Sequence, residues 1–231
     1  MDSSSHKFYH VHGYDTREYL DQLFSDKARS IFGEDSLIFP IEQLKKTFQL
    51  GTRMPHGGEI SPLLSQSLYG MEFHIFSDSN PFVASIQWYG SDQLEDKEGK
   101  VRSALQHVVK CDLEKENMTE PIDLPLADCI ITAVLLDYIS KDQNDYIRYL
   151  RKFSKLLKPG GHLILIGVLD ATYLTVGKDK FHILTYDEDF ARKSLVGEGF
   201  VIDRCEVKKR TNVSDFMDYK ALIFIAAHKE K

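Results

Sequence analysis

Acidic side chains follow two apolar stretches that are expected to form strands. Asp78 comes shortly after the stretch 71–76, and Asp112 comes directly after 108–111. In an alternating α/β sheet, a carboxylate after the second strand can accept hydrogen bonds from both hydroxyls of a ribose. A carboxylate after the third strand can accept a hydrogen bond from an adenine amino group. Together they indicate a site for an adenosyl ligand, although either side chain could instead cap a turn.

Polar and small residues also accompany the later expected strands. The apolar run 129–136 contains Thr132 and Ala133, and the run 162–166 is followed by Asp170. Ligands of doubly wound sheets bind beyond the carboxyl ends of the strands, where these residues are expected to lie. Asp170 could orient a cationic group there, or it could simply form a turn.

Hydrophobic periodicity predicts the elements that position these residues. Apolar residues at helical spacing predict helices at 17–24, 35–48, 141–157 and 187–198. Apolar runs predict strands at 71–76, 108–111, 129–136, 162–166, 200–207 and 221–227. Strand, helix and strand alternate in the middle of the chain, which predicts parallel pairing through a right-handed crossover. The last two strands follow each other directly and predict an antiparallel pair. The expected fold is α/β, a mixed and mostly parallel sheet with helices on both faces.

Length and composition narrow the class of protein. A chain of 231 residues, 42% of them hydrophobic, is expected to form one domain, residues 1–231. Its net charge of −6 argues against a nucleic-acid-binding protein. The cysteines Cys111, Cys129 and Cys205 are scattered, which argues against a disulfide framework or a structural zinc site. No apolar stretch approaches the ~20 residues that span a bilayer, and no signal peptide is visible. We therefore expect a cytoplasmic monomer with no metal and no membrane contact.

Several short motifs resemble one enzyme family. Lys-Cys-Asp at 110–112, Ala-Asp-Cys at 127–129, Lys-Pro-Gly-Gly at 158–161 and Gly-Glu-Gly-Phe at 197–200 resemble class I S-adenosylmethionine methyltransferases. More narrowly, the chain is similar to the nicotinamide, phenylethanolamine and indolethylamine N-methyltransferases, also through Tyr-Asp-Thr-Arg-Glu-Tyr-Leu at 14–20. The resemblance implies a Rossmann-like fold, S-adenosyl-L-methionine as cofactor and methyl transfer to a small amine or ring nitrogen. It also implies that residues 1–48 form a helical lid.

The resemblance assigns roles to individual residues. Tyr19, and Phe24 in place of a second tyrosine, would close the lid over the cofactor. Asp112 would hold the adenine amino group, and Leu113 would pack against the adenine ring. For Tyr19 and Leu113, ordinary core packing is the alternative.

The remaining assignments concern the ribose, the methionine end and the acceptor. Asp78 and Asn80 would hold the ribose. Thr132 and Ala133 would line the methionine end. Tyr173 would lie near the acceptor, unless it too only packs in the core.

The chain departs from the family pattern at the cofactor cradle. The fold needs a first strand that ends in an acidic-Gly-x-Gly turn, whose backbone N–H groups approach the methionine carboxylate. No such turn is present between residues 51 and 100, and the first strand is expected to be altered or missing. Gly51 could substitute for the turn. The alternative is a non-catalytic relative, such as a binding or scaffold protein or an inactive isoform, that has lost the cradle.

The acceptor side departs from the family pattern as well. A carboxylate that follows the strand after Lys-Pro-Gly-Gly in the nicotinamide enzyme is replaced here by Gly167, and a serine that contacts the amide is replaced by Ile183. Nicotinamide is therefore not the expected substrate.

Overall fold

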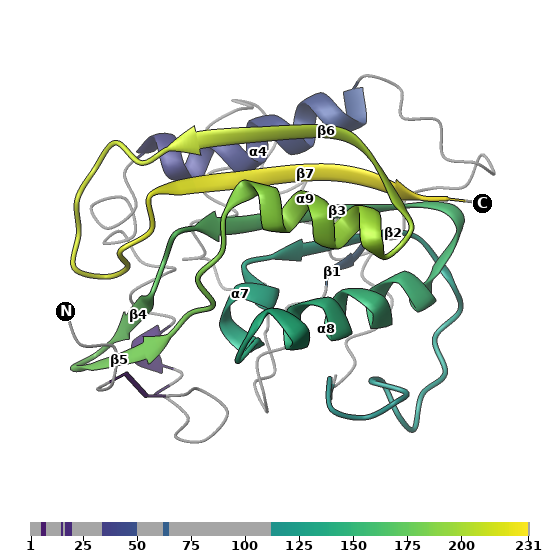
Figure 1. Cartoon of the computed structure of the whole chain (residues 1–231), viewed down its shortest axis with the longest axis horizontal. Coiled ribbons are helices and arrows are strands. Elements are labelled where there is room, and N and C mark those ends of the chain that lie inside the picture. Colours follow the sequence, from purple (N-terminus) through teal and green to yellow (C-terminus); the bar gives the residue numbers. More distant parts are fainter. Residues whose placement is uncertain are drawn as a thin grey trace, which may run out of the picture.

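The computed structural model describes residues 6–7, 15, 17–19, 34–49, 62–64 and 112–230 (Figure 1). The expected strands 71–76 and 108–111 lie outside these residues. So do the site residues predicted at Phe24, Gly51, Asp78 and Asn80.

The main sheet is mixed, as the sequence predicts. Its described strands are β1 (Pro62–Leu64), β2 (Ala127–Ala133), β3 (Leu157–Leu169), β6 (Phe200–Lys209) and β7 (Ala221–Lys229). They lie in the order β1-β2-β3-β7-β6. The pairs β1–β2 and β2–β3 are parallel, whereas β3–β7 and β6–β7 are antiparallel. The parallel pairing across the central helix and the antiparallel carboxyl-terminal pair are thereby confirmed. The three-residue strand β1 pairs with β2. The sequence predicts that the first strand of the sheet is altered or missing.

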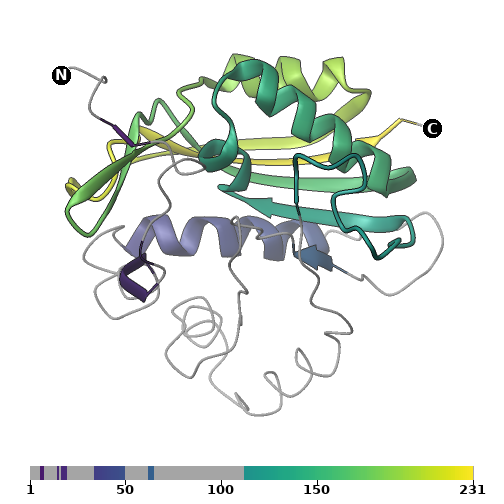
Figure 2. The same ribbon diagram turned by 90° about the horizontal axis from the view of Figure 1, so that it is seen from below.

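Helices cover both faces of the sheet. The helices are α4 (Glu34–Gln49), α7 (Leu135–Ile139), α8 (Gln143–Leu156) and α9 (Glu188–Gly197). With the sheet seen edge-on, α4 lies on one side and α8 and α9 lie on the other (Figure 2). None of the helices in the described part of the chain is long and apolar enough to cross a membrane.

The two faces bury separate hydrophobic clusters. Leu163 and Leu165 of β3 join the cluster on the α8 side, and Ile164 and Ile166 join the cluster on the α4 side. Successive side chains of a strand point to opposite faces, so a strand covered on both sides must be apolar throughout. This is why the run 162–166 shows no polar alternation.

Arg204 of β6 links α4 to the sheet. Its guanidinium donates to the backbone oxygen of Gln43 at 2.6 Å and to the hydroxyl of Thr47 at 2.8 Å. Phe39 of the same helix is buried in the cluster on that face. A charged and an apolar contact thus hold α4 against the sheet.

Side-chain caps define where the two long central helices begin. Asp142 accepts from the backbone N–H of Asp145 at the start of α8, and Asp187 does the same for Phe190 at the start of α9. Such caps satisfy N–H groups that have no partner within the helix. The predictions 141–157 and 187–198 are confirmed to within two residues at each end.

The predicted strand 129–136 is wrong at its end. The strand β2 stops at Ala133, Val134 adopts a left-handed conformation with φ of 54°, and α7 starts at Leu135. The backbone N–H of Val134 donates to the oxygen of Ile166, which closes the turn at 2.7 Å. An apolar run cannot by itself distinguish a buried strand from a buried helix.

The strand predicted at 162–166 is confirmed but extends in both directions. The pairing partner in β3 jumps from Leu157, opposite Ala127, to His162, opposite Cys129, so the residues between them bulge out of register. A side chain at Gly161 would lie 2.9 Å from the Lys158 oxygen. The glycine in Lys-Pro-Gly-Gly therefore permits this close approach of backbone.

A second, two-stranded sheet was not predicted. It is the antiparallel hairpin of β4 (Tyr173–Val176) and β5 (Asp179–His182), turned at Gly177. These strands are short and partly polar, so their alternation is weak.

Candidate functional site

The carboxyl ends of the parallel strands meet at one edge of the sheet. There, Thr132 pairs with Leu165 and Ala133 pairs with Ile166. Thr132 is 1% exposed, and its hydroxyl has no hydrogen-bond partner in the described structure. A buried polar group without a partner costs about 1–3 kcal/mol. A bound polar ligand could remove that cost, so the two residues lie where the sequence predicts ligand binding.

Asp112 lies in a tight turn with a partly free carboxylate. Its backbone N–H donates to the Met118 oxygen at 2.7 Å, and its Oδ1 accepts from the N–H of Glu114 at 3.1 Å. Its Oδ2 has no hydrogen bond to any residue that the structure describes. The turn therefore presents one carboxylate oxygen that can accept a hydrogen bond from a ligand.

Leu113 has a packing role. Its side chain is 3% exposed and belongs to the hydrophobic cluster on the α8 side. Its predicted contact with an adenine ring stays a prediction.

Tyr19 lies against α7, the helix that follows β2. The side chain of Asp15 accepts from the N–H groups of Arg17 and Glu18 at 2.9 and 3.0 Å, which is the helix start that the sequence predicts. Tyr19 itself is 5% exposed and lies against Tyr138 of α7. Burial, followed by the interaction with Tyr19 and the charge of Asp137, raises the pKa of Tyr138, so this phenol stays neutral. The predicted lid residue thus packs into the hydrophobic cluster on the α4 side, and its role as a lid stays a prediction.

The hairpin of β4 and β5 holds the amino-terminal residues. Lys7 donates to the Lys180 oxygen and accepts from the His182 N–H, both at 2.8 Å, and its ammonium contacts Asp179 at 2.6 Å. These bonds add residue 7 beside β5.

The same hairpin meets the helix that carries Tyr19. The Glu18 carboxylate lies so close to Gly177 that a side chain there would stand 2.2 Å from Glu18 Oε2. No sequence pattern predicts this contact, because the two residues are far apart in the chain.

Of the two predicted acceptor residues, Asp170 lies on the connection between β3 and β4, and Tyr173 is the first residue of β4. Asp170 has a left-handed backbone, with φ of 53°, and its half-exposed carboxylate lies 3.6 Å from the Lys220 ammonium. Asp218 accepts from the N–H groups of Thr172 and Tyr173 at 2.7 and 3.1 Å and so fixes the connection. The structure keeps Asp170 accessible to a cation, in competition with Lys220.

Tyr173 presents its ring to cationic and aromatic neighbours. The Lys180 ammonium lies 3.6 Å from the ring centroid, and the His6 ring stands edge-on at 5.4 Å. One face of the ring is therefore already in contact with a cation. A role near the acceptor stays a prediction.

Asp137 is a buried carboxylate to which the sequence analysis gave no role. It is 1% exposed, and its Oδ1 accepts from the Val168 N–H at 2.9 Å and from the Tyr186 hydroxyl at 2.7 Å. Burial raises its pKa to about 6. The only signal in the sequence is a charge that follows a long apolar run.

Gly167 is explained by this buried pair. A side chain at Gly167 would stand 2.2 Å from the Tyr186 hydroxyl and 3.1 Å from Asp137 Oδ1. The space that a carboxylate would need at this position is therefore filled by the hydrogen bond between Tyr186 and Asp137.

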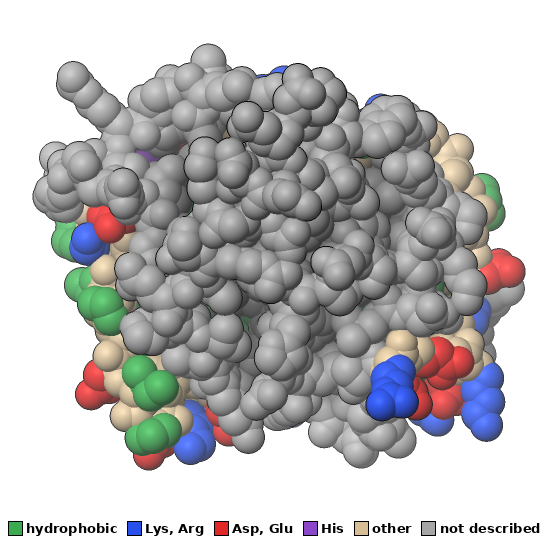
Figure 3. Space-filling model, turned by 180° about the vertical axis from the view of Figure 1, so that it is seen from behind, with side chains coloured by type: hydrophobic (Ala, Val, Ile, Leu, Met, Phe, Trp, Pro, Cys, Tyr) green, Lys and Arg blue, Asp and Glu red, His purple; other side chains and the backbone are tan. Residues whose placement is uncertain are grey.

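Neither thiolate nor metal chemistry is indicated in the part of the chain that the structure describes. Burial raises the pKa of Cys129 to about 12 and that of Cys205 to about 11, so both thiols stay protonated at neutral pH. Within the described ranges, no three His, Cys, Asp or Glu side chains gather as metal ligands. In Figure 3, the described side chains at the edge of the view include both acidic and basic residues, and neither charge dominates.

Comparison with known proteins gives consistent matches. A family model described as the NNMT/PNMT/TEMT family matches residues 81–230. Human nicotinamide N-methyltransferase is 31% identical over 134 residues, which are 58% of this chain and 51% of that protein. Indolethylamine N-methyltransferase from Mus musculus is 28% identical over 135 residues, 58% of this chain and 51% of that protein. Phenylethanolamine N-methyltransferase from the same species is 31% identical over 113 residues, 48% of this chain and 38% of that protein. The chain thus matches about half the length of these relatives or less.

Proposed function

The chain belongs to the NNMT/PNMT/TEMT family, with a Rossmann-like class I methyltransferase fold, and from this premise we propose that it is an S-adenosyl-L-methionine-dependent N-methyltransferase. Its acceptor is a small amine or a ring nitrogen. The observation that carries the proposal is the buried, unpartnered hydroxyl of Thr132 at the edge where β2 and β3 end.

The described residues fit the adenosine and methionine ends of this cofactor. Asp112 offers a carboxylate oxygen for the adenine amino group. The Thr132 hydroxyl and Ala133 backbone lie at the strand end where the methionine moiety would be held. We further propose that Asp78 and Asn80 hold the ribose, that Gly51 takes part in the cradle and that Phe24 joins Tyr19 in the lid.

The protein's part in the reaction is to bind, orient and exclude water. When bound, the cofactor supplies an electrophilic methyl group on sulfur. Tyr19 covers the site, and Asp170 and Tyr173 orient the acceptor nitrogen in line with that methyl group. An unprotonated nitrogen needs no further activation, so no residue is assigned as a general base.

The acceptor is a small amine or a ring nitrogen other than that of nicotinamide. Asp170 is half-exposed, and its ion pair with Lys220 is long, at 3.6 Å, so an amine can take the place of the lysine beside this carboxylate and reacts once it has released its proton to water. At Gly167 there is no room for a second carboxylate. We also propose that the chain acts as a cytoplasmic monomer of one domain, on small molecules rather than nucleic acid.

Calorimetric titration of S-adenosylhomocysteine into the folded chain tests the proposal. We expect saturable binding, followed by transfer of labelled methyl groups from S-adenosylmethionine to one or more members of a panel of small amines. Absence of heat at millimolar ligand would overturn the proposal and favour a non-catalytic relative. Binding without transfer to any amine would favour a protein that senses the cofactor.

A further inference from the structure

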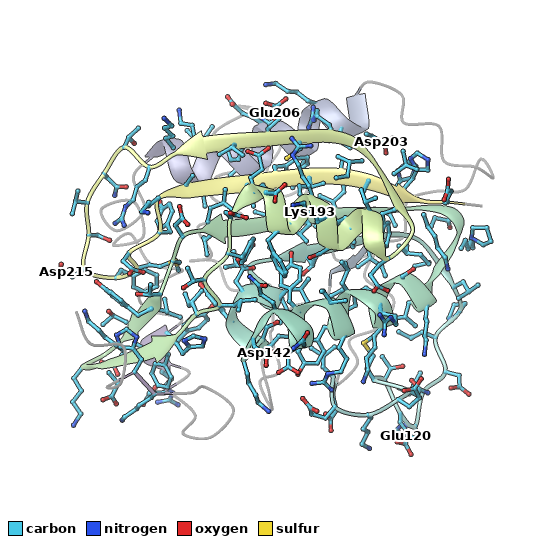
Figure 4. All side chains as sticks on the ribbon, viewed as in Figure 1. Glu120, Asp142, Lys193, Asp203, Glu206 and Asp215 are labelled. Carbon is cyan, nitrogen blue, oxygen red and sulfur yellow. The ribbon has the colours of Figure 1, made fainter. Side chains whose placement is uncertain are left out.

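One face of α8 holds the turn that carries Asp112. The turn runs over 112–118 beside the helix, and Figure 4 marks Asp142 at the helix start and Glu120 just past the turn. The helix residues that contact the turn are Arg148, Tyr149, Lys152 and Lys155. Their spacing places them on one side of the helix.

The side chain of Lys152 binds the backbone of the turn. Its ammonium donates to the backbone oxygens of Leu113 and Lys115, both at 2.6 Å. Within the turn, the backbone N–H of Lys115 donates to the backbone oxygen of Asp112 at 3.2 Å. One ammonium thus fixes both sides of Glu114, whose own N–H orients the Asp112 carboxylate at 3.1 Å.

Glu114 adds a second anchor to the same helix. It accepts from both terminal nitrogens of Arg148, at 3.1 and 3.3 Å, and from the Tyr149 hydroxyl at 2.6 Å. The pair with Arg148 is more than a third exposed on both sides and adds little stability by itself. Its value is geometric, because a two-pronged contact sets the direction of the Glu114 side chain.

Lys155 provides a comparison within the same helix. It contacts the Glu116 side chain at 2.8 Å, but both groups are largely exposed and no backbone oxygen of the turn is involved. Its contact cannot fix the backbone from which Asp112 projects.

We propose that Lys152 is a positioning residue of the cofactor site, which holds the turn so that the Asp112 carboxylate faces an adenine amino group. This inference rests on the proposed function, because it takes the ligand to be an adenosyl group. It adds that α8 contributes to the choice of base through the two backbone oxygens that Lys152 binds.

Matched variants and two ligands test the proposal. We expect Lys152→Met to weaken S-adenosylhomocysteine binding roughly fivefold to tenfold, the loss of about one charge-assisted hydrogen bond. Lys155→Met should stay within about twofold, as expected for an exposed ion pair. S-inosylhomocysteine has a carbonyl in place of the adenine amino group, so its weaker binding should be nearly the same in the wild type and Lys152→Met. Lys152→Arg, which can also donate to two oxygens, should recover part of the affinity.

Hydrogen exchange of the ligand-free chain measures how far the contact of Lys152 stabilises the turn. The amides of Asp112, Glu114 and Lys115 should exchange faster in Lys152→Met than in Lys155→Met. Equal losses with both ligands, equal effects of both variants, or unchanged S-adenosylhomocysteine binding in Lys152→Met would each overturn the positioning role. Failure of the wild type to bind S-adenosylhomocysteine would instead overturn the proposed function and this inference with it.

Discussion

Asp137 is a carboxylate within the core, and its burial makes the free energy of unfolding depend on pH. Burial raises its pKa from 3.8 to about 6, with hydrogen bonds from Val168 and Tyr186 only partly opposing the rise. Between these two values the folded chain holds a proton that the unfolded chain has released. The charge therefore destabilises the folded chain increasingly as the pH rises from about 4 to 6, by about 3 kcal/mol in full at 1.36 kcal/mol per pKa unit.

Asp137→Asn removes this charge while its amide oxygen can still accept both hydrogen bonds. We expect urea unfolding at pH 7.5 to show the variant more stable than the wild type, by up to about 3 kcal/mol. At pH 5 the difference should shrink. The control is Asp189→Asn, which removes an exposed carboxylate and should give the same small difference at both pH values. If the difference in unfolding free energy between Asp137→Asn and the wild type does not change with pH, the raised pKa of the buried Asp137 is wrong.

Gly167 gives a second prediction for a single residue. Gly167→Ala places a methyl group about where the Tyr186 hydroxyl lies, since the two would be 2.2 Å apart. We expect denaturant unfolding to show a loss of about 1–3 kcal/mol, which is typical of an overpacked core. The control is Gly197→Ala in α9, where a side chain meets nothing within 4 Å and the helix should gain roughly 0.5–1 kcal/mol. Adding Tyr186→Phe to Gly167→Ala should restore part of the loss, and no restoration would argue against this contact.

At the scale of elements, the hairpin of β4 and β5 is where the amino-terminal segment docks. Gly177 at its turn has φ of 60°, and an added side chain would also collide with Glu18. We expect Gly177→Ala to loosen this segment, so that trypsin cleaves after Lys7 and Arg17 several times faster. S-adenosylhomocysteine binding should weaken as well, because Tyr19 follows Glu18.

Gly199 provides the matched control for that variant. It has φ of 79°, and a side chain there would meet nothing within 4 Å. Gly199→Ala therefore brings the same kind of backbone strain, about 1 kcal/mol, without a collision. It should lower stability but leave the trypsin cleavage unchanged. Equal cleavage of the two variants would show that strain, rather than the contact with Glu18, explains the effect.

Local signals predicted some elements and not others. The helices α8 and α9 were predictable because Asp142 and Asp187 cap them and their apolar faces repeat at helical spacing. The change from strand to helix at Val134 could not be predicted, because β2 and α7 are both buried and apolar there. The hairpin was missed because β4 and β5 have four residues each, too few for a reliable alternation.

For the whole molecule, the sequence could place site residues on strand ends but could not supply their partners. Thr132 and Asp112 are predicted as site residues because the carboxyl ends of parallel strands share one edge, and their binding roles stay predictions. The contacts of Lys152 with the Asp112 turn, and of Glu18 with Gly177, join distant parts of the chain that only the folded structure brings together. The same holds for Asp137, whose burial depends on three separate elements packing around it.

The proposed reaction makes a last prediction that concerns the molecule as a catalyst. If the protein acts by positioning and the exclusion of water, then only the unprotonated acceptor can attack, and the acceptor's own pKa must govern the rate. We expect kcat/KM to rise with pH and to level off near the pKa of each amine used. Two acceptors whose conjugate acids differ in pKa should therefore shift the profile by that difference. A break at one fixed pH for both acceptors would instead reveal a protein group that removes the proton. Asp137 has a raised pKa, but it is buried and already accepts two hydrogen bonds, so we expect Asp137→Asn to leave the acceptor-dependent break where it is.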